Sequence, residues 1–109
     1  MLNVIHSTQD DFTKTVLESK KPVLVDFWAP WCRPCILMGP VLDELSSEMK
    51  EVVIVKVDVE DPKNQELAHQ YAIRSIPNMK LFRDGKIIHE FVGLMPKESL
   101  KSEILAALA

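Results

Sequence analysis

The sequence predicts an α/β fold in which a central mixed five-stranded sheet is flanked by four helices, which cover both of its faces. Two near-continuous apolar runs, residues 22–29 and 52–59, have the length of strands that are buried on both sides. Segments with apolar residues at helical spacing alternate with these strands. An Asp-Gly pair, Asp84 and Gly85, stands between two further strand-like runs and indicates a tight antiparallel hairpin. A right-handed crossover makes the central strands parallel, and the hairpin adds an antiparallel edge.

The chain begins with a short predicted strand, residues 3–5, which a helix follows. Thr8 is a suitable N-cap, and Asp11 stands three residues later as in a capping box. Phe12 and Val16 lie on one face of this helix, which we expect to end before Pro22. The first helix is therefore expected to pack one apolar side on the sheet.

Three more helices are predicted from apolar spacing. One starts at Pro34 and carries an interior Pro40, which should kink it. A shorter one covers residues 64–72, and Pro96 suits the first turn of the last. The expected inward residues are Met38, Val41, Leu42, Leu45 and Met49, then Leu67, Ala68 and Tyr71, then Leu100, Ile104 and Leu108.

Composition limits the class of protein. At 109 residues the chain is long enough for one hydrophobic core, so we expect residues 1–109 to form a single domain that needs no metal or disulfide to fold. The formal net charge of −3, without a basic block, argues against binding to nucleic acid or an anionic membrane. The start lacks the pattern of a signal peptide, and no apolar run approaches the length of a membrane span. We therefore expect a cytoplasmic protein.

The only two cysteines lie three positions apart, in the stretch "FWAPWCRPC". They come where a strand passes into a helix, which is the edge at which α/β proteins usually build their sites. On the first helical turn, Cys32 would lie near unpaired backbone amides and Cys35 one turn further, close enough for a disulfide. The partial charge of a helix end, at most ~2 kcal/mol, lowers a thiol pKa from about 8.5 toward about 7. A redox pair is therefore predicted.

A metal site is the main alternative for this cysteine pair. A structural zinc site needs four ligands. The chain has two cysteines, and its three histidines are scattered without the spacing of ligands: His6, His69 and His89. We therefore expect no metal.

Asp26 is the one charged residue in an otherwise apolar predicted strand. Its alternation matches that of Leu24 and Trp28, so it either reaches solvent or is buried with a raised pKa. Lys56, at matching alternation on the neighbouring strand, is its candidate partner. Both a structural ion pair and a functional acid are compatible with this placement.

The stretch "WCRPC" resembles the Trp-Cys-Gly-Pro-Cys motif of the thioredoxin family, and it follows "VDFWAP" and precedes "GPVLDEL". The segments "KVDVE", "YAIRSIPN", "LFRDGK" and "FVG" also occur in the family's order and spacing over nearly the whole chain. The resemblance implies the thioredoxin fold and a general protein thiol–disulfide oxidoreductase, acting mainly as a reductase and maintaining cell redox homeostasis. Cys32 would be the nucleophile and Cys35 the resolving thiol. No bound cofactor is implied, and reducing equivalents would come from NADPH through thioredoxin reductase.

The resemblance also implies roles for residues around the cysteines. Asp26 would be the buried acid and base that handles the proton of Cys35. Local chemistry favours a trans bond before Pro77, whereas the resemblance implies a cis proline that faces the cysteines. The partners would be thioredoxin reductase and proteins that contain disulfides. The protein itself would be a monomer. The expected substrate-binding residues are Trp31, Arg33, Pro34, Ile76, Pro77 and Gly93.

Two other functions stay open from the sequence: an oxidant or isomerase in an oxidising compartment, and a binding subunit whose dithiol gates docking. The chain also departs from the family's usual pattern at four positions. Ile36 removes a lysine near the thiols, while Arg33 supplies a positive charge closer to them. The four departures are Arg33 for Gly, Ile36 for Lys, Ala72 for Gly and Asn78 for Thr.

Overall fold

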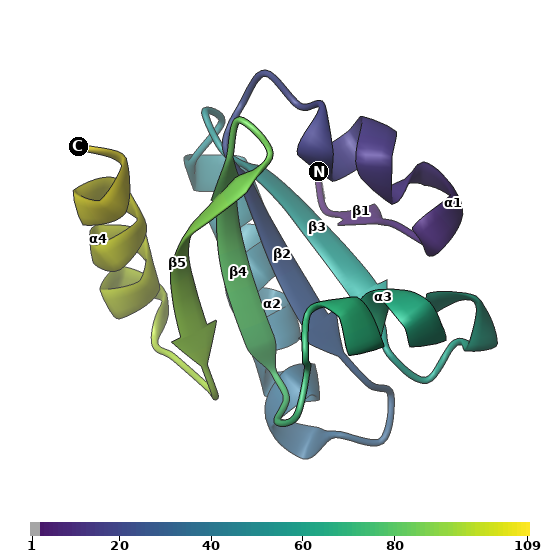
Figure 1. Ribbon diagram of the computed structural model, residues 1–109. Coiled ribbons are helices and arrows are strands. Elements are labelled where there is room, and N and C mark those ends of the chain that lie inside the picture. Colours follow the sequence, from purple (N-terminus) through teal and green to yellow (C-terminus); the bar gives the residue numbers. More distant parts are fainter. Residues whose placement is uncertain (1–2) are drawn as a thin grey trace.

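The computed structural model describes residues 3–109, and a five-stranded mixed sheet forms its centre (Figure 1). The strands are β1 (Ile5–His6), β2 (Val23–Trp28), β3 (Val53–Asp58), β4 (Asn78–Arg83) and β5 (Lys86–Val92). Their order across the sheet is β1-β3-β2-β4-β5. β1 and β2 run parallel to β3, whereas β4 runs antiparallel to β2 and β5. The predicted mixed sheet is confirmed.

The first strand begins later than predicted. Ile5 and His6 pair with β3, but the backbone N–H of Asn3 donates to Ser46 Oγ at 3.4 Å instead of joining the sheet. The first helix then starts as expected, because the Thr8 backbone N–H donates to Asp11 Oδ1 at 3.1 Å. This helix consists of α1 (Gln9–Phe12) and a π-helical segment η1 (Thr13–Leu17), so it ends before Pro22 as predicted. The sequence did not indicate the π-helical part.

The other helices are α2 (Arg33–Glu48), α3 (Gln65–Gln70), preceded by the 3₁₀ turn η2 (Pro62–Asn64), and α4 (Lys97–Leu108). The helix predicted over residues 64–72 was too long at both ends, because Asn64 belongs to η2 and Tyr71 already caps α3. Pro96 was also misplaced: it is the N-cap of α4 and not part of the first turn. α2 continues through Pro40, and the kink expected there stays a prediction.

Helices cover both faces of the sheet, as predicted. On one face, buried residues of α2 and α4 pack with Leu24, Ile54 and Met79. On the other, Phe12, Val16 and Leu67 pack with alternate residues of β2 and β3. Figure 1 shows α2 behind the sheet and α1 and α3 on the side that faces the viewer. Among the predicted inward residues, Met38, Leu42, Leu45, Met49, Leu67, Leu100 and Ile104 are buried, and Val41, Ala68, Tyr71 and Leu108 are half-buried.

The hairpin between β4 and β5 has the predicted tight turn. Asp84 and Gly85 have φ values of 54° and 78°, both in the left-handed region that type I′ turns require. A side chain at Gly85 would also meet the Leu17 carbonyl oxygen, 3.0 Å from an added Cβ. Within residues 3–109, no helix has the length and apolar character needed to cross a membrane.

Candidate active site

Cys32 and Cys35 lie where β2 passes into α2. Cys32 is the N-cap of α2, and its Sγ accepts a hydrogen bond from the Cys35 backbone N–H at 3.3 Å. Pro34 stands in the first turn, where its missing N–H leaves no helical bond unmade. The two cysteines form a disulfide with a Cα–Cα distance of 5.2 Å, within the range usual for such bonds. The helix end therefore holds the pair in position for reversible bond formation.

The two sulfur-bearing residues differ in access. Cys35 is completely buried, whereas 5% of the Cys32 surface is exposed. Trp31, directly before Cys32, is 68% exposed. Of the two cysteines, only Cys32 therefore has surface exposed to solvent.

A second segment of the chain meets the cysteines from the start of β4. The Ile76–Pro77 peptide bond is cis, as the resemblance to the family implies. The Cys32 Sγ lies 3.8 Å from the Ile76 carbonyl oxygen, and the Gly93 N–H donates to the Pro77 carbonyl oxygen at 2.8 Å. The sheet thereby brings Ile76, Pro77 and Gly93 to the edge that carries the disulfide.

Gly93 keeps the surface beside the cysteines open. Its φ of 92° favours glycine, and an added Cβ would meet no atom within 4 Å. A bound chain can therefore approach the backbone at this point.

Exposed apolar side chains are concentrated on the segments around the disulfide. The sequence patterns did not indicate that Leu37, Val92 or Leu94 belong to the site, and Ile36 stood out only as a departure from the family. A signal existed in α2, because Ile36 and Leu37 fall outside its predicted buried face and are still apolar. The exposed apolar residues on these segments are Trp31, Ile36, Leu37, Val92 and Leu94.

Asp26 is fully buried in β2 and pairs in register with Lys56 of β3. Within the described residues, neither of its carboxylate oxygens has a hydrogen-bond partner. Burial raises the pKa of Asp26 from 3.8 to about 7, and the positive charge of Lys56 offsets part of that rise. The carboxyl is thus able to gain or lose a proton near neutral pH.

Lys56 contacts an aromatic ring and not the carboxylate. Its Nζ lies 4.4 Å from the centroid of the Trp28 ring, a cation–π geometry. Because the Asp26 oxygens accept no hydrogen bond from it, Lys56 acts on Asp26 through its charge. Trp28 is half-buried and also packs against the cluster that contains both cysteines.

Arg33 and Pro34 are exposed at the start of α2. Across residues 3–109 the Arg33 guanidinium makes no ion pair or side-chain hydrogen bond. The same part of the chain holds no group of three or more His, Cys, Asp or Glu residues that could bind a metal ion.

The sequence is similar to thioredoxins along nearly its whole length. The family model described as Thioredoxin matches residues 3–106. The chain is 44% identical to the thioredoxin of Haemophilus influenzae over 105 residues, which cover 95% of this chain and 96% of that one. It is 45% identical to Thioredoxin 1 of Synechococcus elongatus over 98 residues, or 89% and 90% of the two chains. With Thioredoxin C-2 of Corynebacterium nephridii it shares 43% identity over 102 residues, 93% of each chain.

Proposed function

The chain belongs to the thioredoxin family and is a protein-disulfide reductase that works by dithiol–disulfide exchange; from this premise we propose which of its residues carry the reaction and what regenerates it. The observation that supports the assignment best is the unequal access of two bonded cysteines at the N-terminus of α2. Residues 1–109 form a single thioredoxin domain in this proposal.

Cys32 is the nucleophile. Its thiolate attacks one sulfur of a substrate disulfide, a new Cys32–substrate bond forms, and the other substrate sulfur leaves as a thiolate that takes up a proton. The Cys35 N–H, which donates to Cys32 Sγ at 3.3 Å, would stabilise that negative charge together with the helix end. The attack by Cys32 thus leaves a mixed disulfide between Cys32 and the substrate, next to the buried Cys35.

Cys35 resolves the mixed disulfide with the help of Asp26. With a pKa of about 7, about half of the Asp26 carboxyls are ionised at neutral pH and able to accept the Cys35 proton. The Cys35 thiolate then attacks Cys32 Sγ, the mixed disulfide breaks, and the second substrate thiol is released with a proton. Two electrons and two protons have then passed to the substrate, and the Cys32–Cys35 disulfide is formed.

The substrate chain docks on the edge formed by Trp31, Ile76, Pro77 and Gly93. The Ile76 backbone lies next to Cys32, so an extended segment around the substrate disulfide would pair with it. The exposed Trp31 would supply apolar contact on one side, and the open surface at Gly93 would admit the chain on the other. Arg33 and Pro34 complete this surface at the start of α2.

The oxidised protein must receive two electrons before the next cycle. We infer that an NADPH-dependent thioredoxin reductase supplies them, so the chain itself needs no bound cofactor. The protein would act as a monomer in the cytoplasm, where it would keep the thiols of other proteins reduced and maintain redox homeostasis.

Two cysteine variants test the roles of the thiols. Cys32→Ser should abolish the reduction of insulin disulfides, whereas Cys35→Ser should accumulate mixed disulfides that are visible on a non-reducing gel. A Cys32→Ser protein with normal activity would contradict the proposal. The reduction potential separates the reductase from an oxidant: about −270 mV supports reduction, and about −120 mV supports oxidation. A binding subunit would instead keep its biological role when both cysteines are replaced by serine.

A further inference from the structure

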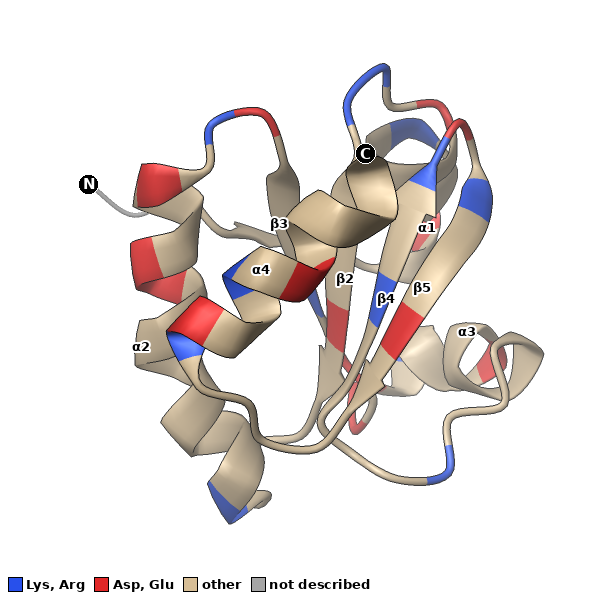
Figure 2. Ribbon diagram, turned by 90° about the vertical axis from the view of Figure 1, so that its left-hand side faces the viewer, with Lys and Arg blue, Asp and Glu red and all other residues tan. Residues whose placement is uncertain are grey.

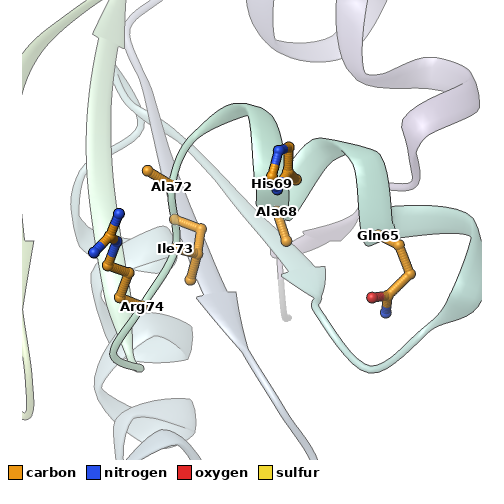
Figure 3. A pocket seen from close by; sticks show the side chains of 6 residues that line it. All are labelled: Gln65, Ala68, His69, Ala72, Ile73 and Arg74. Atoms are coloured by element: carbon orange, nitrogen blue, oxygen red, sulfur yellow. The ribbon is translucent and has the colours of Figure 1, made fainter.

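A surface pocket lies at the end of α3, just before the segment that reaches Cys32. Its volume is about 330 Å³. That size is at the lower end of the range for small-molecule sites, so it suits one side chain of a bound protein better than a large cofactor. Figure 3 shows the residues that line it: Gln65, Ala68, His69, Ala72, Ile73 and Arg74.

Backbone hydrogen bonds hold the walls of this pocket together. α3 ends in a Schellman motif, in which the Ala72 N–H donates to the His69 carbonyl and the Ile73 N–H to the Ala68 carbonyl, both at 3.0 Å. Ala72 has a φ of 52°, as the motif requires. On the far side, Gln65 Nε2 donates to the Val59 carbonyl oxygen at 2.9 Å. The pocket is therefore part of the folded framework.

The chemistry of the lining favours a carboxylate. Arg74 and His69 are exposed, and neither side chain makes an ion pair or hydrogen bond within the part of the chain that the structure describes. No Asp or Glu is among the lining residues. In the view of Figure 3 the apolar side chains of Ala72 and Ile73 lie between Arg74 and His69. An arginine binds a carboxylate through two parallel hydrogen bonds, and the apolar atoms next to it suit the methylenes of an acidic side chain.

The pocket is within reach of a substrate held at the disulfide. Arg74 stands two residues before Ile76, whose carbonyl oxygen lies 3.8 Å from Cys32 Sγ. Two extended residues span at most about 7 Å. In a substrate bonded to Cys32, a residue a few positions from the substrate's own cysteine can therefore reach Arg74.

We propose that this pocket is a specificity subsite for an Asp or Glu side chain that flanks the disulfide of a protein substrate. Arg74 pairs with the carboxylate, and the apolar side chain of Ile73 beside it contacts the methylenes of the acidic residue. The proposal rests on the disulfide-reductase function and adds a preference for one class of substrate.

The test uses a panel of disulfide-containing peptides that differ only in having Glu, Gln or Lys at each position flanking the attacked cysteine. For each variant the measured quantity is the ratio of kcat/KM for the Glu peptide to that for the Gln peptide. The wild type should show a ratio of about three to ten at one or more neighbouring positions, and salt should reduce it. Arg74→Gln should bring the ratio close to one, and Arg74→Glu should make a Lys peptide the preferred one.

Arg83→Gln is the matched control. Arg83 lies at the end of β4, next to the hairpin turn, and donates to the Leu108 carbonyl oxygen at 3.2 Å. The change removes the same charge far from the start of β4, so the Glu preference should persist. A ratio close to one at every position in the wild type overturns the proposal, as does a ratio that Arg83→Gln lowers as much as Arg74→Gln. Failure of the wild type to reduce either peptide contradicts the reductase function itself, which is a different result.

Discussion

Two buried charged residues lie on neighbouring strands of the sheet, and they differ in whether their charge has a hydrogen-bonded partner. Asp26 of β2 and Lys80 of β4 are 0% and 6% exposed. Asp26 is opposite Met79 and faces α2 and α4, whereas Lys80 is opposite Val25 and faces the other layer. Figure 2 shows the acidic segment of β2 beside the basic segment of β4 and the acidic segment of β5.

The difference between the two is the presence of a bonded partner. Lys80 Nζ donates to Glu90 Oε2, which also accepts from Asn78 Nδ2 at 3.3 Å. The carboxylate of Asp26 accepts no hydrogen bond within residues 3–109. A paired buried charge contributes to structure, whereas an unpaired one keeps a shifted pKa at the expense of stability and is available for proton transfer. We therefore predict that substitutions at the two sites change the free energy of unfolding in opposite directions.

The largest expected effect is at Asp26. A rise in its pKa from 3.8 to about 7 corresponds to about 4 kcal/mol. Between these two values the folded state holds a proton that the unfolded state has lost, so the free energy of unfolding falls as pH rises. Asp26→Asn should therefore be more stable than the wild type by up to about 4 kcal/mol at pH 8, with the gain fading toward pH 4.

Urea unfolding at several pH values checks this prediction. Asp10→Asn is a suitable control, since Asp10 is exposed on α1. A gain in stability that is the same at pH 4 and pH 8 would mean that the carboxylate charge is not its source.

The opposite sign is expected at Glu90. Glu90→Gln removes the anion that accepts a hydrogen bond from buried Lys80, so it should destabilise the protein by about 1–2 kcal/mol at neutral pH. The loss should be smaller than for a fully buried ion pair, because the Glu90 side chain is half exposed. The Lys80 hydrogen bond lowers the pKa of Glu90, so this contribution is present above the pKa of an unfolded Glu and is lost as pH falls through the lowered value. Chemical denaturation measures both the size and the pH dependence.

Adding Lys80→Met to Glu90→Gln sharpens the result. The double variant should regain part of the lost stability, because no buried charge is then left unpaired. If the stability losses caused by Glu90→Gln alone and by Lys80→Met alone simply add in the double variant, the two side chains do not depend on each other, and the contrast with Asp26 fails.

Lys56→Gln tests how the charge of Lys56 acts on Asp26. Its positive charge lowers the pKa of Asp26, so its removal should raise that pKa further. The resolving step should then slow severalfold at pH 7 and recover at higher pH, which stopped-flow decay of a mixed disulfide would measure. The Asp26→Asn protein should not respond to Lys56→Gln, and a response there would assign the effect to the Trp28 contact instead.

The sequence predicted much of this arrangement because alternation along a strand is a simple geometric rule. Asp26 and Lys56 share a face for the same reason that Leu24 and Ile54 do, and the register places them opposite each other, although no hydrogen bond joins their side chains. The helix that carries the cysteines was predicted from apolar spacing and Pro34, and its start at Arg33 agrees within one residue. Local rules were sufficient in these cases.

Other features depend on contacts that local patterns do not contain. The partner of Lys80 lies across a hairpin whose register shifts between Leu81 and Phe82, so simple alternation does not identify it. The pocket beside α3 needs Ala72 in a left-handed conformation, which is uncommon for a residue with a Cβ. The cis bond before Pro77 was implied by family resemblance, because its local chemistry favours trans.

Arg33 extends the comparison to an unpaired charge at the surface, where the expected effect is smallest. Its guanidinium has no partner in the described chain and stands next to Cys32, so it should stabilise the thiolate by about 0.5–1 kcal/mol, as exposed pairs do. Because this stabilises the reduced form, Arg33→Gly should raise the Cys32 pKa and lower the reduction potential by about 10–20 mV. Thiolate absorbance and equilibration with glutathione measure the two quantities. Unlike Asp26, Arg33 is solvated. Its effect on the Cys32 thiolate should therefore decline with added salt, whereas the effect of Asp26 on stability should persist. Unchanged values of both quantities would show that solvent screens this charge completely and that an unpaired charge influences the dithiol only where it is buried.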